Sequence, residues 1–478
     1  MIYKKLKQER GNSPNEKKEK ALEKSRKQLK CLLLLFLVVS NLSKLEAQVL
    51  FKDDKSTFGT SGYIRSGIGK SEGGETQAHF QMPGALNKYS LGNQADTYGE
   101  LEFDYMYFLN AEKDKTIDMV WMSTFYEAFG SIKQMEFDKA AQLYVRGKNL
   151  LGKGEVIWMG KRYYDRKAIH LLDKQWINPA QNGWGMGVEK LIQKNTNEDL
   201  KIGVWTFDDK NVVSFKNGEI SRLNNYTLDA RWVNKPITPT TNLNLAVNYS
   251  YRVKNDVLDY DEKQGFGAFA WLDYEKKSIT NTTAILFRQG ATISKNHWTG
   301  VAERENPDNT ATVLNNLNTA YTLEISNNFL YDDLDRFAVN GVLMAIIRDY
   351  GTDPYVYNAM SPSQRDYIPG RGNMTYWLTS GARGMYYLND NFKLSLEFTH
   401  EYIKNEQLAV SGNLDKISFT PEISLKKGFY SRPVLRPLIT YAFWSNDLKG
   451  KIGTTPTGAP FANKTSGFTY GLQFEIWW

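Results

Sequence analysis

The chain has 478 residues with 28 Tyr, 24 Phe and 12 Trp, yet its mean hydropathy is −0.51. After residue 40 no stretch is apolar over the ~20 residues that a transmembrane helix needs, which excludes a helical membrane protein. The formal charge of +7 is matched by the first 30 residues alone, which hold 11 Lys/Arg and four Glu. The remainder is close to neutral and gives no electrostatic reason to expect a nucleic-acid partner.

The amino-terminal segment has the pattern of an export signal. A basic stretch from Lys4 to Lys30 precedes a short apolar run, Cys31 to Val39, and the small Ala47 suits a signal peptidase. We therefore expect residues 1–47 to be a signal peptide and residues 48–478 to be one β-barrel domain. The basic stretch is long, which leaves a wrongly assigned start or a cytoplasmic extension open. Cys31 is the only cysteine, so the exported part has neither disulfides nor thiolate chemistry.

Beyond the leader, apolar and polar residues alternate, which is typical of strands with two differently solvated faces. The clearest examples are Leu243–Val253, Phe392–Tyr402 and Phe468–Trp478, and both short turns and long Gly/Asn/Pro-rich loops separate such segments. A soluble β-sandwich alternates too. Aromatic residues near the strand ends and the terminal aromatic Trp478 favour a transmembrane antiparallel β-barrel in the bacterial outer membrane, bounded by lipid.

The length of the exported part gives the size of this barrel. At ~10 residues per strand plus loops it makes on the order of 16 to 20 strands. A barrel of that size encloses water, so a pore is the expected function.

The histidines give no sign of catalysis. His79, His170, His297 and His400 show no nucleophile or metal-ligand spacing. We therefore expect a channel rather than an enzyme, with no catalytic residues, no metal and no cofactor.

Several segments resemble, in this order, the maltoporin family of sugar porins. They are Gly62–Gly69, Lys88–Asn93, Thr97–Leu101, Gly147–Leu150, Trp158–Tyr164, Ser431–Pro433 and Phe474–Trp478. The resemblance is specific near both ends of the exported part and rests mainly on pattern between them. It implies an all-β barrel of about 18 strands with an inward-folded third loop. It also implies a homotrimer that passes maltose or maltooligosaccharide-type carbohydrates by passive diffusion.

In that family sugar rings slide along a row of aromatic side chains flanked by polar groups. Carried over by position, the aromatics are Tyr63, Tyr98, Tyr430 and Trp477. Strand alternation agrees, because Trp477 shares its face with Glu475, and Tyr98 shares its face with Glu100. The polar partners that the resemblance implies are Arg65, Glu100, Arg166 and Asp173.

Two further aromatic positions are carried over less directly. A loop aromatic that reaches into the neighbouring subunit is assigned to Phe137, with Phe129 as the alternative, and a mid-barrel aromatic is assigned to Phe266.

The chain also departs from the family pattern. Ser90 replaces a basic residue, Ala168 an acidic residue and Gln175 a tyrosine at the constriction. His79 and Ala95 stand at the positions of a first-loop disulfide, which is therefore absent. These changes leave the sugar undetermined and keep open a general or weakly selective porin of the same architecture, without saturable sugar binding.

Overall fold

The computed structural model describes residues 48–478 except 86, 130–134, 177–182, 193–196, 209–211, 214–218, 222–223, 258–259, 294–302, 306–310, 314–318, 350–373, 407 and 454–459. The predicted signal peptide, residues 1–47, lies outside the described residues.

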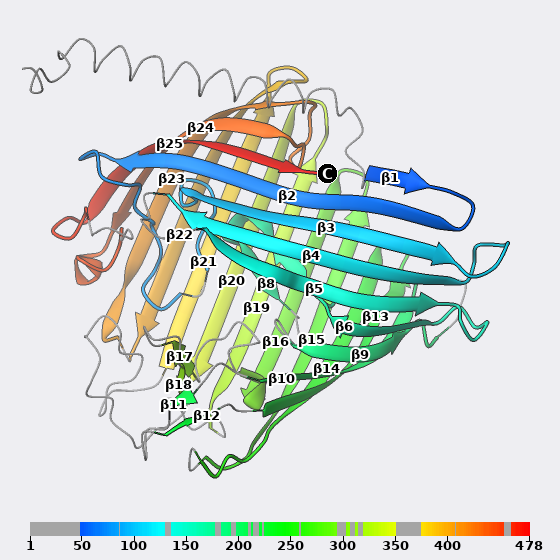
Figure 1. Ribbon diagram of the computed structural model, residues 1–478. Coiled ribbons are helices and arrows are strands. Elements are labelled where there is room, and N and C mark those ends of the chain that lie inside the picture. Colours follow the sequence, from blue (N-terminus) through cyan, green and yellow to red (C-terminus); the bar gives the residue numbers. More distant parts are fainter. Residues whose placement is uncertain are drawn as a thin grey trace, which may run out of the picture. The chain divides into compact units, whose positions relative to one another are not determined.

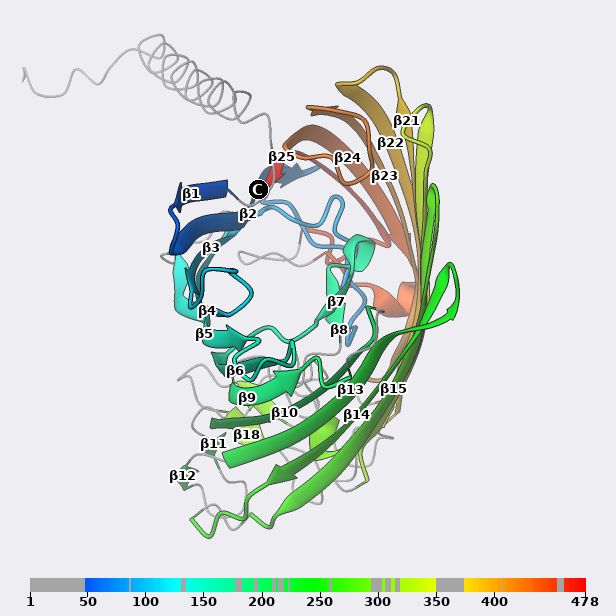
Figure 2. The same cartoon turned by 90° about the vertical axis from the view of Figure 1, so that its right-hand side faces the viewer.

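The fold is a closed antiparallel β-barrel of eighteen strands (Figures 1 and 2). The wall consists of β2 (Ser56–Ser71), β3 (Asp96–Phe108), β4 (Thr116–Ala128), β5 (Glu136–Lys148), β6 (Val156–Lys161), β9 (Trp184–Glu189), β10 (Asp199–Asp208), β13 (Asn224–Thr238), β14 (Thr241–Arg252), β15 (Lys263–Lys276), β16 (Ile279–Gly290), β19 (Tyr321–Asp332), β20 (Phe337–Asp349), β21 (Met374–Tyr387), β22 (Phe392–Asn405), β23 (Val410–Ser424), β24 (Val434–Trp444) and β25 (Ser466–Trp477). Each strand pairs with the next, and β25 pairs with β2 to close the ring.

The remaining elements are short. β1 (Gln48–Lys52) pairs with β2 next to the end of β25, and its residues Val49, Leu50 and Phe51 are exposed. β7 (Lys167–Ile169), η1 (His170–Leu172) and β8 (Lys174–Trp176) lie between β6 and β9. The others are β11 (Val212–Val213), β12 (Ile220–Ser221), η2 (Ala291–Ile293), β17 (Glu303–Glu305), β18 (Ala311–Val313) and η5 (Asn446–Leu448).

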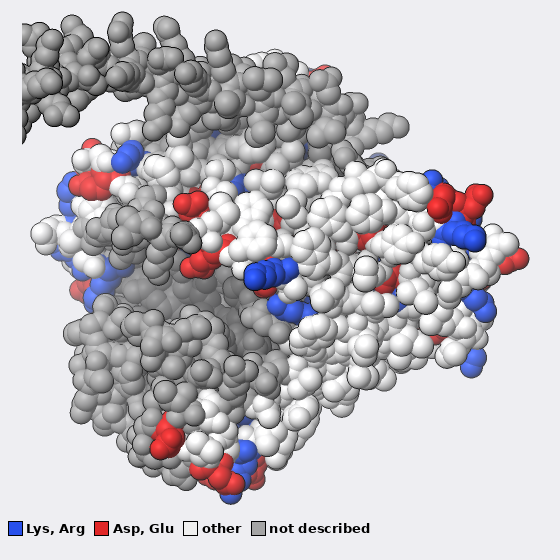
Figure 3. Space-filling model, in the orientation of Figure 1, with Lys and Arg blue, Asp and Glu red and all other residues white. Residues whose placement is uncertain are grey.

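The two faces of each strand are solvated as the alternation predicts. On β14 the exposed, outward side chains are Leu245, Val247 and Tyr249, and the buried, inward ones include Asn244, Ser250 and Arg252. In the space-filling view the outer wall is mostly uncharged, and charged side chains gather toward the strand ends (Figure 3). The described residues include no helix that is long and apolar enough to cross a membrane.

Two of the loops that the structure describes fold into the barrel. The segment with β7, η1 and β8 is the predicted inward loop, and it lies within the ring of strands in Figure 2. Tyr164, at its start, is buried against Trp158 and Trp205, with ring centroids 5.3 and 4.9 Å away. The first loop, residues 72–95, joins it, because the Ser90 N–H donates to the Leu171 carbonyl at 2.8 Å.

The first loop is also tied to the far wall. The Tyr89 hydroxyl hydrogen-bonds Thr379 Oγ1 at 2.7 Å, and Lys416 Nζ donates to the Leu91 carbonyl at 2.5 Å. Space for the Tyr89 ring comes from Gly381, where a Cβ would lie 2.5 Å from that ring. Both inward loops are therefore held against the strands and do not hang free in the lumen.

We expect Gly381→Ala to loosen the first loop, because the added methyl group overlaps the Tyr89 ring. The cost should be about 1–3 kcal/mol, as for overpacking in a core, and should appear as a lower unfolding temperature in heat-modified gel migration. Gly384→Ala, on the same strand with open space around its Cβ, is the matched control. Equal stability of the two variants would contradict this packing.

Candidate functional site

A cavity of about 310 Å³ lies between the two inward loops and the strands β2, β3 and β25. Seven of the ten predicted site residues line it: Tyr63, Arg65, Tyr98, Glu100, Arg166, Asp173 and Trp477. The other lining residues are Ser90, Leu91, Gln94, Ala168, Ile169, His170, Lys174, Gln175, Arg436, Gln473 and Glu475. Residues that are more than 400 positions apart in the chain thus share one cavity.

Aromatic rings from three adjacent strands form a row along this cavity. The centroid of Tyr63 on β2 lies 6.1 Å from that of Tyr98 on β3 and 6.3 Å from that of Trp477 on β25. Strand register brings them together, because Tyr63 is the direct partner of both Trp477 and Glu100. His170 lies next to Trp477, and Tyr430 lies next to His170. We call the rings of Tyr98, Tyr63, Trp477, His170 and Tyr430 the aromatic row.

Carboxylates hold the hydroxyl groups of the two tyrosines. The Tyr98 hydroxyl donates to Glu100 Oε1 at 2.6 Å, and the Tyr63 hydroxyl donates to Glu475 Oε1 at 3.1 Å. Each ring is therefore fixed at its polar tip, while its apolar face stays available for contact.

Charged side chains around the row are mostly paired with each other. Arg65 Nε donates to Asp96 Oδ1 at 2.8 Å, and Arg65 Nη1 lies 3.6 Å from Asp173. Arg166 Nη2 lies 3.4 Å from Glu100 Oε1. The cavity thus presents fixed donors and acceptors with little uncompensated charge, an arrangement suited to an uncharged, hydroxyl-bearing ligand.

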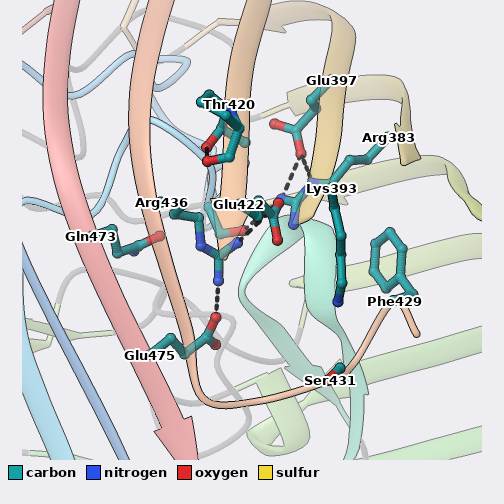
Figure 4. A network of polar contacts seen from close by, with 12 residues as sticks. Arg383, Lys393, Glu397, Thr420, Glu422, Phe429, Ser431, Arg436, Gln473 and Glu475 are labelled. Atoms are coloured by element: carbon teal, nitrogen blue, oxygen red, sulfur yellow. Dashed lines mark hydrogen bonds and ion pairs between the residues drawn. The ribbon is translucent and has the colours of Figure 1, made fainter. Parts of the chain in front are cut away.

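On the β25 side the polar network extends into the wall. Glu475 forms an ion pair with Arg432 at 2.7 Å. It also pairs with Arg436, which lies 4.0 Å from Glu422 (Figure 4). Deeper in the wall, Glu397 pairs with Arg383 and Lys416 at 2.7 and 3.0 Å. Because a charge buried without a partner is costly, the pairs with Arg432 and Arg436 keep the Glu475 carboxylate in place beside the Tyr63 hydroxyl.

Tyr430 joins the row at one end, although it does not line the cavity. It is 39% exposed, and its ring lies edge-on to His170 at 5.4 Å. The turn that carries it is held by two hydrogen bonds, from the Phe429 N–H to Asp332 Oδ2 and from Lys393 Nζ to the Gly428 carbonyl, each 2.8 Å long.

Phe266 is not part of the site, and its prediction as a mid-barrel lumenal aromatic is corrected. It is 50% exposed on the outer face of β15, with its centroid 5.6 Å from that of Phe287. The inward positions on either side of it are Gly265 and Gly267, so strand alternation points Phe266 outward.

Phe137 also lies outside the cavity. It is a residue of β5 rather than of a loop, pairs with Phe125 of β4, and is 58% exposed on the outer face. Phe129, the alternative, follows β4 directly, and its N–H donates to the Ala95 carbonyl at 3.0 Å.

His170 is a site residue that the histidine spacing did not reveal. Its ring lies between Trp477, 6.4 Å away, and Tyr430. Burial lowers the pKa of His170 to about 3, and Arg432, whose Nη2 lies 3.4 Å from His170 Nε2, acts in the same direction. His170 Nε2 therefore accepts a hydrogen bond from Arg432, and the neutral His170 ring carries its proton on Nδ1.

Three of the departures from the family pattern lie on the cavity wall. Ser90, Ala168 and Gln175 are lining residues that carry no charge. Lys174 lines the cavity but is paired with Glu324 at 3.0 Å. Among the described residues no group of three or more His, Cys, Asp or Glu could hold a metal ion.

The neutral histidines should make folding stability depend on pH. Burial lowers the pKa of His79 to about 4, and that of His170 to about 3, from 6.5. Between pH 6.5 and these lowered pKa values the unfolded chain binds more protons than the folded chain. The free energy of unfolding should therefore fall as pH falls from 6.5 toward 4. We expect His170→Gln to reduce that fall by on the order of a few degrees in unfolding temperature. An identical pH profile for both proteins would show that His170 is not held neutral.

The model of the LamB porin family matches residues 58–478. Among solved structures, OmpT, an outer-membrane protein of Vibrio cholerae, is similar with a TM-score of 0.41 and 9% identity, over 90% of this chain and 100% of that chain. An anion-selective porin from Comamonas acidovorans has a TM-score of 0.42 and 8% identity, over 88% of this chain and 100% of that chain.

Proposed function

Because the chain belongs to the LamB porin family, we propose that this outer-membrane porin passes maltose or maltooligosaccharide-type carbohydrates selectively by passive diffusion. The observation that carries the proposal is the row of Tyr98, Tyr63 and Trp477, with centroids 6.1 and 6.3 Å apart on one side of the cavity.

The chemistry of a sugar ring matches this surface. Its C–H groups lie on the ring faces and its hydroxyls around the edge, so an aromatic face and flanking ionic groups satisfy both. Because neighbouring aromatic centroids lie about 6 Å apart, a moving sugar can contact the next aromatic ring before it leaves the previous one. Several weak contacts in series bind a sugar without trapping it.

Arg65, Arg166, Glu100 and Asp173 are the proposed hydrogen-bonding partners of the sugar hydroxyls. Each lines the cavity and is already positioned by an ion pair, so little side-chain entropy is lost when a sugar binds. His170 Nδ1–H adds a neutral donor beside Trp477.

A general porin is the second candidate. It is favoured by the uncharged lining residues Ser90 and Ala168, because they leave fewer charged side chains for a sugar to bind. In such a porin the aromatic row would line the lumen without saturable binding.

We further propose that the chain is exported, loses residues 1–47 and assembles as a homotrimer. The outward, exposed position of Phe137 supports a contact with a neighbouring subunit. Blue-native electrophoresis and amino-terminal sequencing of the purified protein test both points.

Planar-bilayer recording tests sugar selectivity directly. Maltotriose should block the ion current saturably, and Trp477→Ala or Tyr98→Ala should weaken that block by roughly 1 to 3 kcal/mol through the loss of one aromatic contact. Phe266→Ala is the matched control, because it removes an outward aromatic and should leave the block unchanged. A current that no maltooligosaccharide alters would favour the general porin, and an unaltered block in both row variants would defeat the assignment of the aromatic row.

A further inference from the structure

We propose that Arg432 is a positioning residue for Trp477 and that it controls how a sugar ring lies on that end of the aromatic row. This inference rests on the proposed function and deepens it. It concerns a residue that belongs to a turn and is not part of the cavity wall.

The first observation is the stacking of the two side chains. Arg432 Cζ lies 4.4 Å from the centroid of the Trp477 ring, close enough for a guanidinium lying over the indole face. Trp477 lines the cavity, whereas Arg432 is buried outside it. The guanidinium therefore contacts the indole from outside the cavity, and on this proposal a ligand uses the opposite face.

The second observation is how firmly the guanidinium is held. Arg432 Nη1 donates to the carbonyls of Phe429 and Ser431 at 3.3 and 3.1 Å. Nη2 lies 2.7 Å from Glu475 Oε2. Bonds from both ends of a planar group fix its plane, and a stacked indole must then follow that plane.

The third observation is that the same guanidinium reaches two other rings of the row. Arg432 Nη2 lies 3.4 Å from His170 Nε2. Arg432 also acts on the orientation of Tyr63, because its ion-pair partner Glu475 accepts a hydrogen bond from the Tyr63 hydroxyl. One buried cation thus contacts Trp477 and His170 directly and acts on Tyr63 through Glu475.

A purely structural role for Arg432, closing the turn that carries Tyr430, predicts a different result. Loss of the turn would disturb the row whether or not Trp477 is present. A positioning role acts through the indole, so its effect should disappear when the indole is absent. A double-mutant cycle separates the two.

The experiment uses the purified full chain in planar bilayers with maltotriose as the probe. Arg432→Gln should weaken the block roughly three- to tenfold, the scale of one cation–π contact. Arg432→Lys keeps the charge but loses the flat, forked geometry, so we expect an intermediate block. In a Trp477→Ala background, Arg432→Gln should add less than a roughly twofold further loss.

The matched control is Arg252→Gln. Arg252 is a buried arginine on β14 that donates to Asn225 Oδ1 at 2.7 Å, across the barrel from the row. Its replacement should leave the block unchanged. Heat-modified gel migration confirms that each variant is folded, and Arg432→Lys serves if Arg432→Gln does not assemble.

The outcomes are distinguishable. A wild-type block that is unchanged in Arg432→Gln overturns the positioning role and leaves the proposed function intact. An equal loss with and without Trp477 also overturns it, because Arg432 would then act through the turn alone. No saturable block in the wild-type protein overturns the proposed function and this inference together.

Discussion

Closure of the strand ring is the constraint on which the rest of the structure depends. In a bilayer each backbone N–H and C=O must find its partner within the protein, and only a closed set of strands provides that for a sheet. Here the condition is met by the pairing of β2 with β25, from Tyr63 with Trp477 to Ser71 with Thr469. The same pairing places two rings of the aromatic row side by side, so the seam of the barrel is also the centre of the site.

The inner face carries many charges, and their pairing gives the site its rigidity. Arg383, Glu397 and Lys416 are almost completely buried, and both cations are paired with Glu397. Removing one partner would leave a buried charge uncompensated, which costs far more than the pair itself contributes. Such networks on β21 to β25 hold the inward loops against the wall and fix the carboxylate behind Tyr63.

The site is assembled from three kinds of segment. Strands supply Tyr63, Tyr98 and Trp477, the inward loop supplies His170, and a turn supplies Tyr430 with Arg432. The strand residues are set by register, and the loop and turn residues by specific side-chain bonds. Two kinds of constraint therefore meet at Trp477: strand pairing through its backbone, and the guanidinium over its ring.

The sequence by itself determined the barrel class, the inward direction of Tyr98 and Trp477 and the approximate number of strands, because alternation has a period of two and each face meets a different solvent. The family resemblance added the order of the segments and seven residues that now share one cavity. Phe266 was assigned wrongly, because a resemblance resting on pattern alone does not settle which face of a strand an aromatic occupies.

Only the tertiary structure decided the rest. His170 and Arg432 enter the site through contacts between segments far apart in the chain, and no local periodicity encodes such contacts. The tethering of the first loop to Thr379 and the partner of each buried charge are likewise properties of the closed barrel. Period and composition are local and can be read along a chain, whereas packing across a lumen depends on how the strands are registered around the whole ring.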